Sequence, residues 1–171
     1  MQEILQNCPE AHIKVAGISV LGVNGIKSRI KIPAYGKYLR RLILKNRLEG
    51  KVRVLGNLSA EEMKREYLSA QIFVCPSAVE NSPNSVAEGQ LLGVPVAASR
   101  TGGIPDVVKD GVSGLLFEKG NIHELAACVS RILTDKQLAK ELSASERETA
   151  AKLYNGENNY QKLIEIYQSI E

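Results

Sequence analysis

The stretch QIFVCPSAVENSPNSVAEGQLLGVPVAAS, from Gln71 to Ser99, places one helical segment between two apolar runs. The runs QIFVCPS and VPVAAS are short and rich in apolar residues, which predicts two buried strands. Between them, PNSVAEGQLLG is typical of a helix, and Pro83 suits its first position. A strand, a helix and a second strand in this order predict parallel strands joined by a crossover.

The same alternation extends in both directions along the chain. Strands are expected at 12–19, 51–56 and 113–118; helices at 35–50, 59–70, 121–135, 136–154 and 156–171; a loop at 20–33; and a turn with about one helical turn at 101–111. Ser59 and Glu62 form a capping box, and Gly50 is expected to stop the helix before it. The pattern predicts an α/β fold with a Rossmann-like parallel sheet covered on both faces.

Composition limits the class of protein. The 171 residues, taken as one domain with C-terminal helices at about 135–171, have 44% hydrophobic and 24% charged residues, as ordinary globular proteins do. A net charge of +3 is too mild for a nucleic-acid-binding protein. The basic run at 37–45 is interpreted as a solvated helix face, with peripheral contact to an anionic membrane left open.

The cysteines and the apolar runs bear on localisation. Cys8, Cys75 and Cys128 form no CxxC motif, so no zinc or redox site is predicted, and Cys75 is expected to be a buried core thiol. No run approaches the length of a membrane span, and the first residues lack the features of a signal peptide. The prediction is a cytoplasmic protein, either free or peripheral to the inner face of the membrane.

The carboxyl ends of the strands are where ligands of open parallel sheets bind. The loop after Cys75 leads from Glu80 into the predicted helix. If Ser82 caps this helix and Pro83 opens it, the amides of residues Asn84–Val86 face an anion such as a phosphate, which the helix dipole favours.

Two carboxylates flank this helix start. Glu88 could accept hydrogen bonds from a ribose diol, and Glu80 from the hydroxyls of another sugar. The alternative is structural: Ser85 and Glu88 also have the spacing of a capping box, which would leave Glu80 as a solvated loop charge. Spacing alone favours the capping box. Gly102–Gly103 similarly fits either a close backbone approach to a ligand or a plain turn.

The order of motifs from Val79 to Phe117 resembles the donor-binding region of group 1 (family 4) glycosyltransferases of the GT-B fold. That family has E-x7-E, G-x-P-V, GG-x-P-E and G-x-x-G. The matching positions here are Glu80 with Glu88, Gly93–Val96, Gly102–Asp106, and Gly111 with Gly114. The flanking strands and helices are similar too, so the likeness covers nearly the whole chain. This order shifts the balance from a capping box toward a donor site.

The resemblance implies a role for each matching residue. Glu80 would lie at the catalytic centre and hold hydroxyls of the donor sugar, and Glu88 would hold the ribose. Ser82 and residues Asn84, Ser85 and Val86 would bind the diphosphate, Gly102 and Gly103 would contribute to the donor site, and Gly56, Asn57 and Leu58 would lie by the base. Such enzymes retain the anomeric configuration and need no protein-bound metal or further cofactor. The leaving-group charge is met by the helix N-terminus and basic side chains.

The sequence departs from the family pattern at a few positions. Asp106 stands where Glu is usual, and Gly89 replaces an Ala, which costs about 1 kcal/mol of helix propensity. The family's first donor-domain strand, with its Gly-Arg loop, and the whole acceptor domain would precede Met1. We therefore expect this chain to be most of the donor half of a two-domain enzyme, weak or inactive alone. Direct pairing of the strand at 13–17 with that at 72–75 would contradict this expectation.

The predicted function is transfer of a sugar from a nucleotide-diphospho-sugar to an acceptor, a glycan or a lipid-linked glycan held by the missing N-terminal domain. The alternative is a non-catalytic or degenerate GT-B module that only binds nucleotide-sugars. A GT-B epimerase would need acid and base groups at the cleft that the sequence does not supply. A flavodoxin-like phosphate-binding domain would leave Glu80 without a role.

Overall fold

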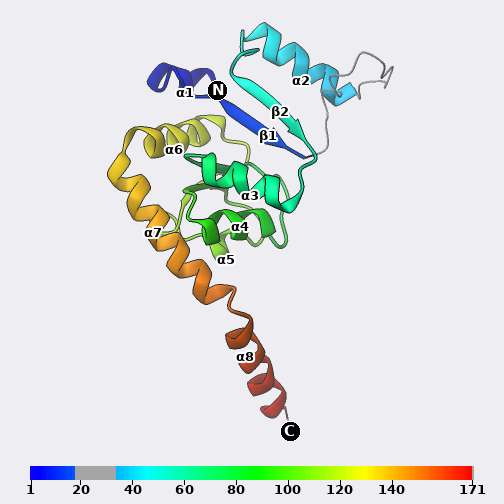
Figure 1. Cartoon of the computed structure of the whole chain (residues 1–171), viewed down its shortest axis with the longest axis vertical. Coiled ribbons are helices and arrows are strands. Elements are labelled where there is room, and N and C mark those ends of the chain that lie inside the picture. The colour runs from blue at the N-terminus through cyan, green and yellow to red at the C-terminus, as the bar shows by residue number, and fades with distance from the viewer. Residues whose placement is uncertain (18–33, 171) are drawn as a thin grey trace. The chain divides into compact units, whose positions relative to one another are not determined.

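The computed structural model describes residues 1–17 and 34–170, in which parallel strands alternate with helices (Figure 1). The expected loop at 20–33 and the end of the first predicted strand lie outside the described residues. The chain divides into two compact units, residues 1–66 and 67–171. Each unit is described by itself, and the single-domain interpretation stays a prediction.

The first unit contains a two-stranded parallel sheet. Its elements are α1 (Gln2–Asn7), β1 (Ile13–Ala16), α2 (Ala34–Lys45), β2 (Val52–Gly56) and most of α3 (Ala60–Ser69). Strands β1 and β2 pair from Ile13 opposite Val52 onward. The capping box of α3 is confirmed, because the Ser59 amide donates to Glu62 Oε2 at 2.8 Å.

The end of α2 differs from the expected stop at Gly50. The helix ends at Lys45, and Arg47 adopts a left-handed conformation with φ of 53°. The Arg47 amide then donates to the Leu44 carbonyl and the Leu48 amide to the Ile43 carbonyl, the two bonds of a Schellman motif. Glycine usually occupies this position, so an arginine there gives no sequence signal for the end of a helix.

The second unit is built on a three-stranded parallel sheet in the order β3-β4-β5. Its elements are β3 (Phe73–Cys75), α4 (Asn84–Leu92), β4 (Val96–Ser99), α5 (Ile104–Val107), β5 (Leu115–Phe117), α6 (Ile122–Thr134), α7 (Lys136–Leu153) and α8 (Gly156–Gln168). Helices α4 and α6 pack on the sheet, and α7 packs against both. Helix α8, which has no buried residue, extends beyond the end of α7 (Figure 1). The α/β fold with parallel strands is confirmed.

The pairing of the strands bears on the expected missing strand. Among the described residues β1 pairs with β2, and β3 pairs with β4, so the direct pairing of β1 with β3 that would contradict the expectation is not found. Within residues 1–17 and 34–170 the strands form a two-stranded and a three-stranded parallel sheet. The fragment interpretation itself stays a prediction.

The core of the second unit lies around its central strand. All four residues of β4 are buried, and Val96, Ala97 and Ala98 are fully inaccessible to solvent. Around them lies one cluster of buried apolar residues: Cys75, Val86, Val96, Ala98, Ile104, Val108 and Leu116. A strand buried on both faces reads as a continuous apolar run, which is why VPVAAS was recognisable in the sequence. The prediction that Cys75 is a buried thiol is confirmed.

Gly89, the residue at which the family has alanine, faces an aromatic ring. A Cβ on Gly89 would lie 3.3 Å from Phe73 Cδ1, a few tenths of an ångström tighter than ordinary contact. We expect Gly89→Ala to change the free energy of unfolding by less than about 1 kcal/mol, because the gain in helix propensity is offset by this contact.

The same substitution in a Phe73→Leu background provides the control. There the ring is gone, and Gly89→Ala should stabilise by about the full 1 kcal/mol of propensity. Urea unfolding of the four proteins measures this cycle. Equal effects in both backgrounds would show that Phe73 is not the reason for the glycine.

Candidate functional site

The loops that follow β3 and β4 are joined at the carboxyl ends of these neighbouring strands. Three hydrogen bonds connect them: Ser99 Oγ to the Ser77 carbonyl (2.6 Å), Thr101 Oγ1 to the Ala78 carbonyl (3.3 Å), and the Gly103 amide to the Glu80 carbonyl (3.1 Å). Ligands of open parallel sheets bind at the carboxyl ends of the strands. The predicted site residues in these two loops therefore lie where a ligand is expected.

Gly102 and Gly103 allow two backbones to come together. Gly102 has φ of +52°, and a Cβ there would lie 1.5 Å from the Glu80 carbonyl oxygen. A Cβ on Gly103 would lie 2.5 Å from the Asn81 carbonyl oxygen. Of the two alternatives left open for this pair, a close backbone approach is found, and the approaching partner is the Glu80–Asn81 backbone. A direct role of these glycines in donor binding stays a prediction.

The first turn of α4 is capped differently from the prediction. Pro83 occupies the N-cap, and no side chain hydrogen-bonds to the cap, so the expected cap by Ser82 is wrong. The Asn84 amide donates to the Ser82 carbonyl and the Val86 amide to the Pro83 carbonyl, both at 2.9 Å. Proline has no side-chain hydrogen-bond acceptor. The backbone carbonyls of Ser82 and Pro83 therefore accept from these amides in place of a capping side chain.

These bonds single out one of the three predicted amides. Within the described part of the chain, the Ser85 amide makes no hydrogen bond, whereas the Asn84 and Val86 amides do. An unpaired amide at the positive end of a helix is suited to an anion. Of the three predicted amides, the Ser85 amide is the one without a hydrogen-bond partner among the described residues, and binding of an anion by all three stays a prediction.

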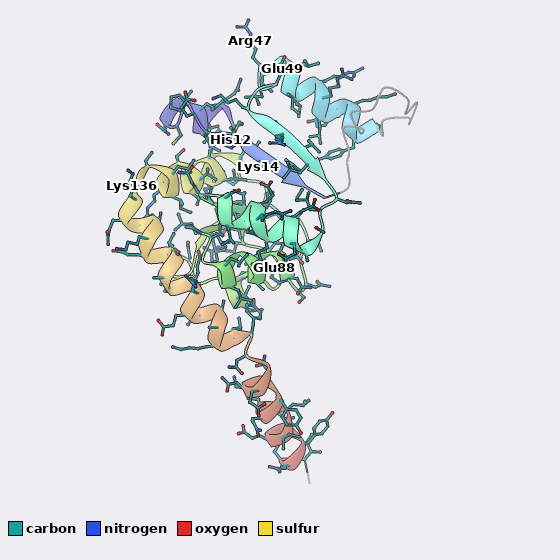
Figure 2. The ribbon with its side chains drawn as sticks, viewed as in Figure 1. His12, Lys14, Arg47, Glu49, Glu88 and Lys136 are labelled. Atoms are coloured by element: carbon teal, nitrogen blue, oxygen red, sulfur yellow. The ribbon has the colours of Figure 1, made fainter. Side chains whose placement is uncertain are left out.

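Glu88 lies on α4, about one turn after Ser85 (Figure 2). Its Oε2 is 3.3 Å from the hydroxyl of Tyr67, which donates also to the Ser85 carbonyl at 3.0 Å. The alternative of a Ser85–Glu88 capping box is wrong, because α4 has no side-chain cap. The prediction that Glu88 does not fold back onto the Ser85 amide is confirmed, and the carboxylate is exposed.

Glu80 is half-buried and belongs to the loop after β3. Its carboxylate accepts a long hydrogen bond from Ser77 Oγ (3.4 Å), and its carbonyl is held by the Gly103 amide. The backbone of Glu80 is thus held by the loop after β4, while its carboxylate has one weak partner among the described residues. Such a carboxylate keeps most of its acceptor capacity for hydroxyl groups.

Gly56, Asn57 and Leu58 follow β2 in the first unit. Gly56 has a left-handed φ of +75°, and its carbonyl accepts from the Gly17 amide at 2.8 Å. Asn57 is exposed and Leu58 is half-buried. Their participation in one site with Glu80 and Glu88 stays a prediction.

Among the buried polar side chains that sequence reasoning missed, Gln90 and Glu146 are the largest. Gln90 on α4 is fully buried, and its amide nitrogen donates to the carbonyls of Val107 (3.0 Å) and Ser113 (3.1 Å). Gln90 therefore fixes the chain after α5 against the helix that carries Glu88. The signal was a single polar residue inside an otherwise apolar helix face.

The second missed residue is Glu146 on α7, whose side chain is fully buried. Its Oε1 accepts from the Val96 amide at 2.9 Å, and its Oε2 has no hydrogen-bond partner in the described residues. Burial raises the pKa of this carboxyl to about 8, and the Val96 amide offsets only part of the rise. Acidic residues on long helices are usually solvated, so no local signal predicts that this one is buried.

The arrangement combines an unpaired amide at a helix N-terminus, an exposed carboxylate one turn on, and a loop carboxylate at the same sheet edge. It suits a ligand with both an anionic group and hydroxyls. Among the described residues no three His, Cys, Asp or Glu side chains gather as metal ligands, and no described helix is long and apolar enough to span a membrane.

The chain matches the family Glycosyl transferases group 1 over residues 1–149 and belongs to it. It is 26% identical over 165 residues to the uncharacterized glycosyltransferase MJ1178 of Methanocaldococcus jannaschii, covering 94% of this chain and 46% of that protein. It is 32% identical over 119 residues to a D-inositol 3-phosphate glycosyltransferase of Corynebacterium urealyticum, covering 70% and 28%. The chain thus spans less than half the length of these curated relatives.

Solved structures share the fold. The Anabaena protein HepE in complex with UDP has a TM-score of 0.80 at 21% identity, over 99% of this chain and 45% of that one. Sucrose-phosphate synthase from Thermosynechococcus elongatus has a TM-score of 0.77 at 24% identity, over 99% and 41%. The expected resemblance to the group 1 family is confirmed, and its GT-B neighbours establish the fold class.

Proposed function

We propose that this chain is the donor-binding half of a retaining glycosyltransferase, which transfers a sugar from a nucleotide-diphospho-sugar to an acceptor. The observation that carries the proposal is the unpaired Ser85 amide at the N-terminus of α4, one turn from the exposed Glu88 carboxylate. Every nucleotide-diphospho-sugar carries both a diphosphate, which suits the amide, and a ribose diol, which suits the carboxylate. HepE, whose fold this chain shares, has been solved with UDP and with UDP-glucose.

Each part of a donor has a partner in the proposal. The diphosphate lies at the Ser85 amide, where the helix dipole stabilises the negative charge that grows on the leaving group. The ribose diol donates to Glu88, and the sugar hydroxyls donate to Glu80. The scheme uses no metal or further cofactor, and the positive end of α4 is proposed to stabilise the charge.

The acceptor is proposed to be a glycan or a lipid-linked glycan. This chain is similar to the amylovoran biosynthesis glycosyltransferase AmsK of Erwinia amylovora, 29% identical over 138 residues. The acceptor is proposed to bind outside the segment that this chain shares with such relatives. Retention of the anomeric configuration is proposed from the same family membership.

Calorimetry of the 171-residue chain with UDP, GDP and ADP tests the donor site. The preferred diphosphate should bind, and Glu88→Ala should weaken it about 10- to 100-fold, since a hydrogen bond to a charged group contributes about 1.5–3 kcal/mol. The matched control is Glu141→Ala, which removes an exposed glutamate of α7 whose one hydrogen bond among the described residues is to Gln137 on the same helix. The control should bind as the unaltered chain does.

Two results would contradict the donor site. One is the absence of binding for all three nucleotides up to millimolar concentration. The other is an equal affinity of the unaltered chain and Glu88→Ala, which would remove the carboxylate from the site.

A further inference from the structure

Tyr67 is a buried residue in the last turn of α3 whose hydroxyl reaches α4. Its side chain is 4% exposed, and its ring meets Phe73 edge to face with centroids 5.2 Å apart. The ring is therefore fixed by packing, and the hydroxyl is fixed with it. The sequence places no catalytic motif at this position.

The hydroxyl contacts the Glu88 carboxylate, which the proposed donor site uses, and the carbonyl of Ser85, the residue whose amide the site uses. It lies 3.0 Å from the Ser85 carbonyl and 3.3 Å from Glu88 Oε2, and its single proton is shared between these two acceptors. Burial raises the pKa of Tyr67, and the negative charge of Glu88 raises it further, so the hydroxyl remains a donor across the physiological range.

The contact with Tyr67 determines which carboxylate oxygen of Glu88 remains available to a ligand. A glutamate at an exposed helix position samples several rotamers, and ordering it on binding has an entropic cost of roughly 1 kcal/mol or more. With Oε2 held by Tyr67, the carboxylate is ordered beforehand. No described residue donates a hydrogen bond to Oε1, which remains open to a hydroxyl.

We infer that Tyr67 is a positioning residue, which holds the Glu88 carboxylate in place and thereby sets the preference of the site for nucleotides with an intact ribose diol. This inference rests on the proposed function. Tyr67 touches no part of the donor in this scheme and acts through Glu88. Its hydroxyl should therefore matter only for ligands that bind Glu88.

The test compares two nucleotides rather than one. Tyr67→Phe keeps the ring and its contact with Phe73 and removes only the hydroxyl. With UDP, calorimetry should show about a fivefold loss of affinity, the size expected for one hydrogen bond. With 2′,3′-dideoxy-UDP, which has no diol, the affinity should stay unchanged. If the first calorimetry series favours GDP or ADP, that nucleotide and its dideoxy form replace UDP.

Tyr154→Phe is the matched control. Tyr154 lies at the end of α7, and burial raises its pKa as it does for Tyr67, but it contacts none of the proposed site residues in the described structure. Its substitution should leave the affinities for both nucleotides unchanged. Unfolding by urea should show that Tyr67→Phe remains folded.

A double-mutant cycle separates positioning from a general structural effect. In a Glu88→Ala background, Tyr67→Phe should have no further effect on UDP, because there is no carboxylate left to hold. An equal loss for UDP and its dideoxy form, or a loss that persists without Glu88, overturns the inference. If Glu88→Ala loses affinity and Tyr67→Phe does not, this inference fails alone; if Glu88→Ala has no effect, the proposed function fails.

Discussion

Replacement of Gly102 by alanine is expected to lower the free energy of unfolding by about 2–4 kcal/mol, the range of mutations that force a clash in a packed structure. The new Cβ would lie 1.5 Å from the Glu80 carbonyl oxygen. That atom belongs to the backbone and cannot move away by changing a rotamer. The two loops must separate, which breaks the hydrogen bond from the Gly103 amide to Glu80. Urea unfolding followed by circular dichroism measures the loss.

Gly111→Ala is the control for backbone conformation. Gly111 also has a left-handed φ, +74°, but a Cβ there would meet nothing within 4 Å. Gly111→Ala should lower the free energy of unfolding only by the cost of placing a Cβ in a left-handed conformation, roughly 1–2 kcal/mol. The excess at Gly102 then measures the clash with Glu80. Equal losses at the two glycines would refute the close approach, and a Gly102→Ala variant that bound donors normally would show that the placement of Glu80 does not depend on it.

Glu146→Gln is expected to stabilise the protein at pH 8 and to have little effect at pH 5. Burial raises the pKa of Glu146 from its ordinary value of 4.5 to about 8. Between these two values the folded chain binds this proton and the unfolded chain has lost it. Stability therefore falls as the pH rises, and the full contribution is present only below about pH 4.5. The loss by pH 8 is on the order of 3–5 kcal/mol.

The glutamine variant is neutral at every pH and can still accept from the Val96 amide. Unfolding free energies of both proteins at several pH values between 4 and 9 should converge at the acid end and diverge toward pH 8. Glu148→Gln is the control, because Glu148 is exposed on the same helix and paired with Lys152. Glu148→Gln should not remove the fall in the free energy of unfolding between pH 5 and pH 8. A stability difference between Glu146→Gln and the unaltered chain that is independent of pH would show that Glu146 has the same pKa in the folded and unfolded states, so that burial does not raise it.

The fold was predictable because its signals are local. The apolar runs around β3 and β4 and the capping box at Ser59 depend on neighbours within a few residues, and each was found. The left-handed Arg47 lacked such a signal, because its conformation is set by the Schellman bonds and not by its side chain.

The hydrogen bonds around the candidate site were not predictable from the sequence. Strand order predicts Glu80 and Glu88 near one sheet edge, which stays a prediction, and the spacing of Ser85 and Glu88 wrongly suggested a capping box. The hydrogen-bond partner that the Glu88 carboxylate has instead is Tyr67, which is 21 residues away in the sequence. Glu146 was hidden for the same reason, since its partner Val96 is 50 residues away. Contacts at such separations depend on packing, which periodicity does not encode.

The strand order of the second sheet has a consequence for the way this unit is made. Each strand pairs with the next strand along the chain, so β3, β4 and β5 can assemble in the order in which a ribosome releases them. The Val96 amide, at the start of the central strand, receives its partner only when Glu146 on α7 has emerged. We expect a nascent chain stopped before α7 to form the sheet without the hydrogen bond from Val96 to Glu146. Such a sheet should be cleaved by proteases at β4 until α7 packs against it.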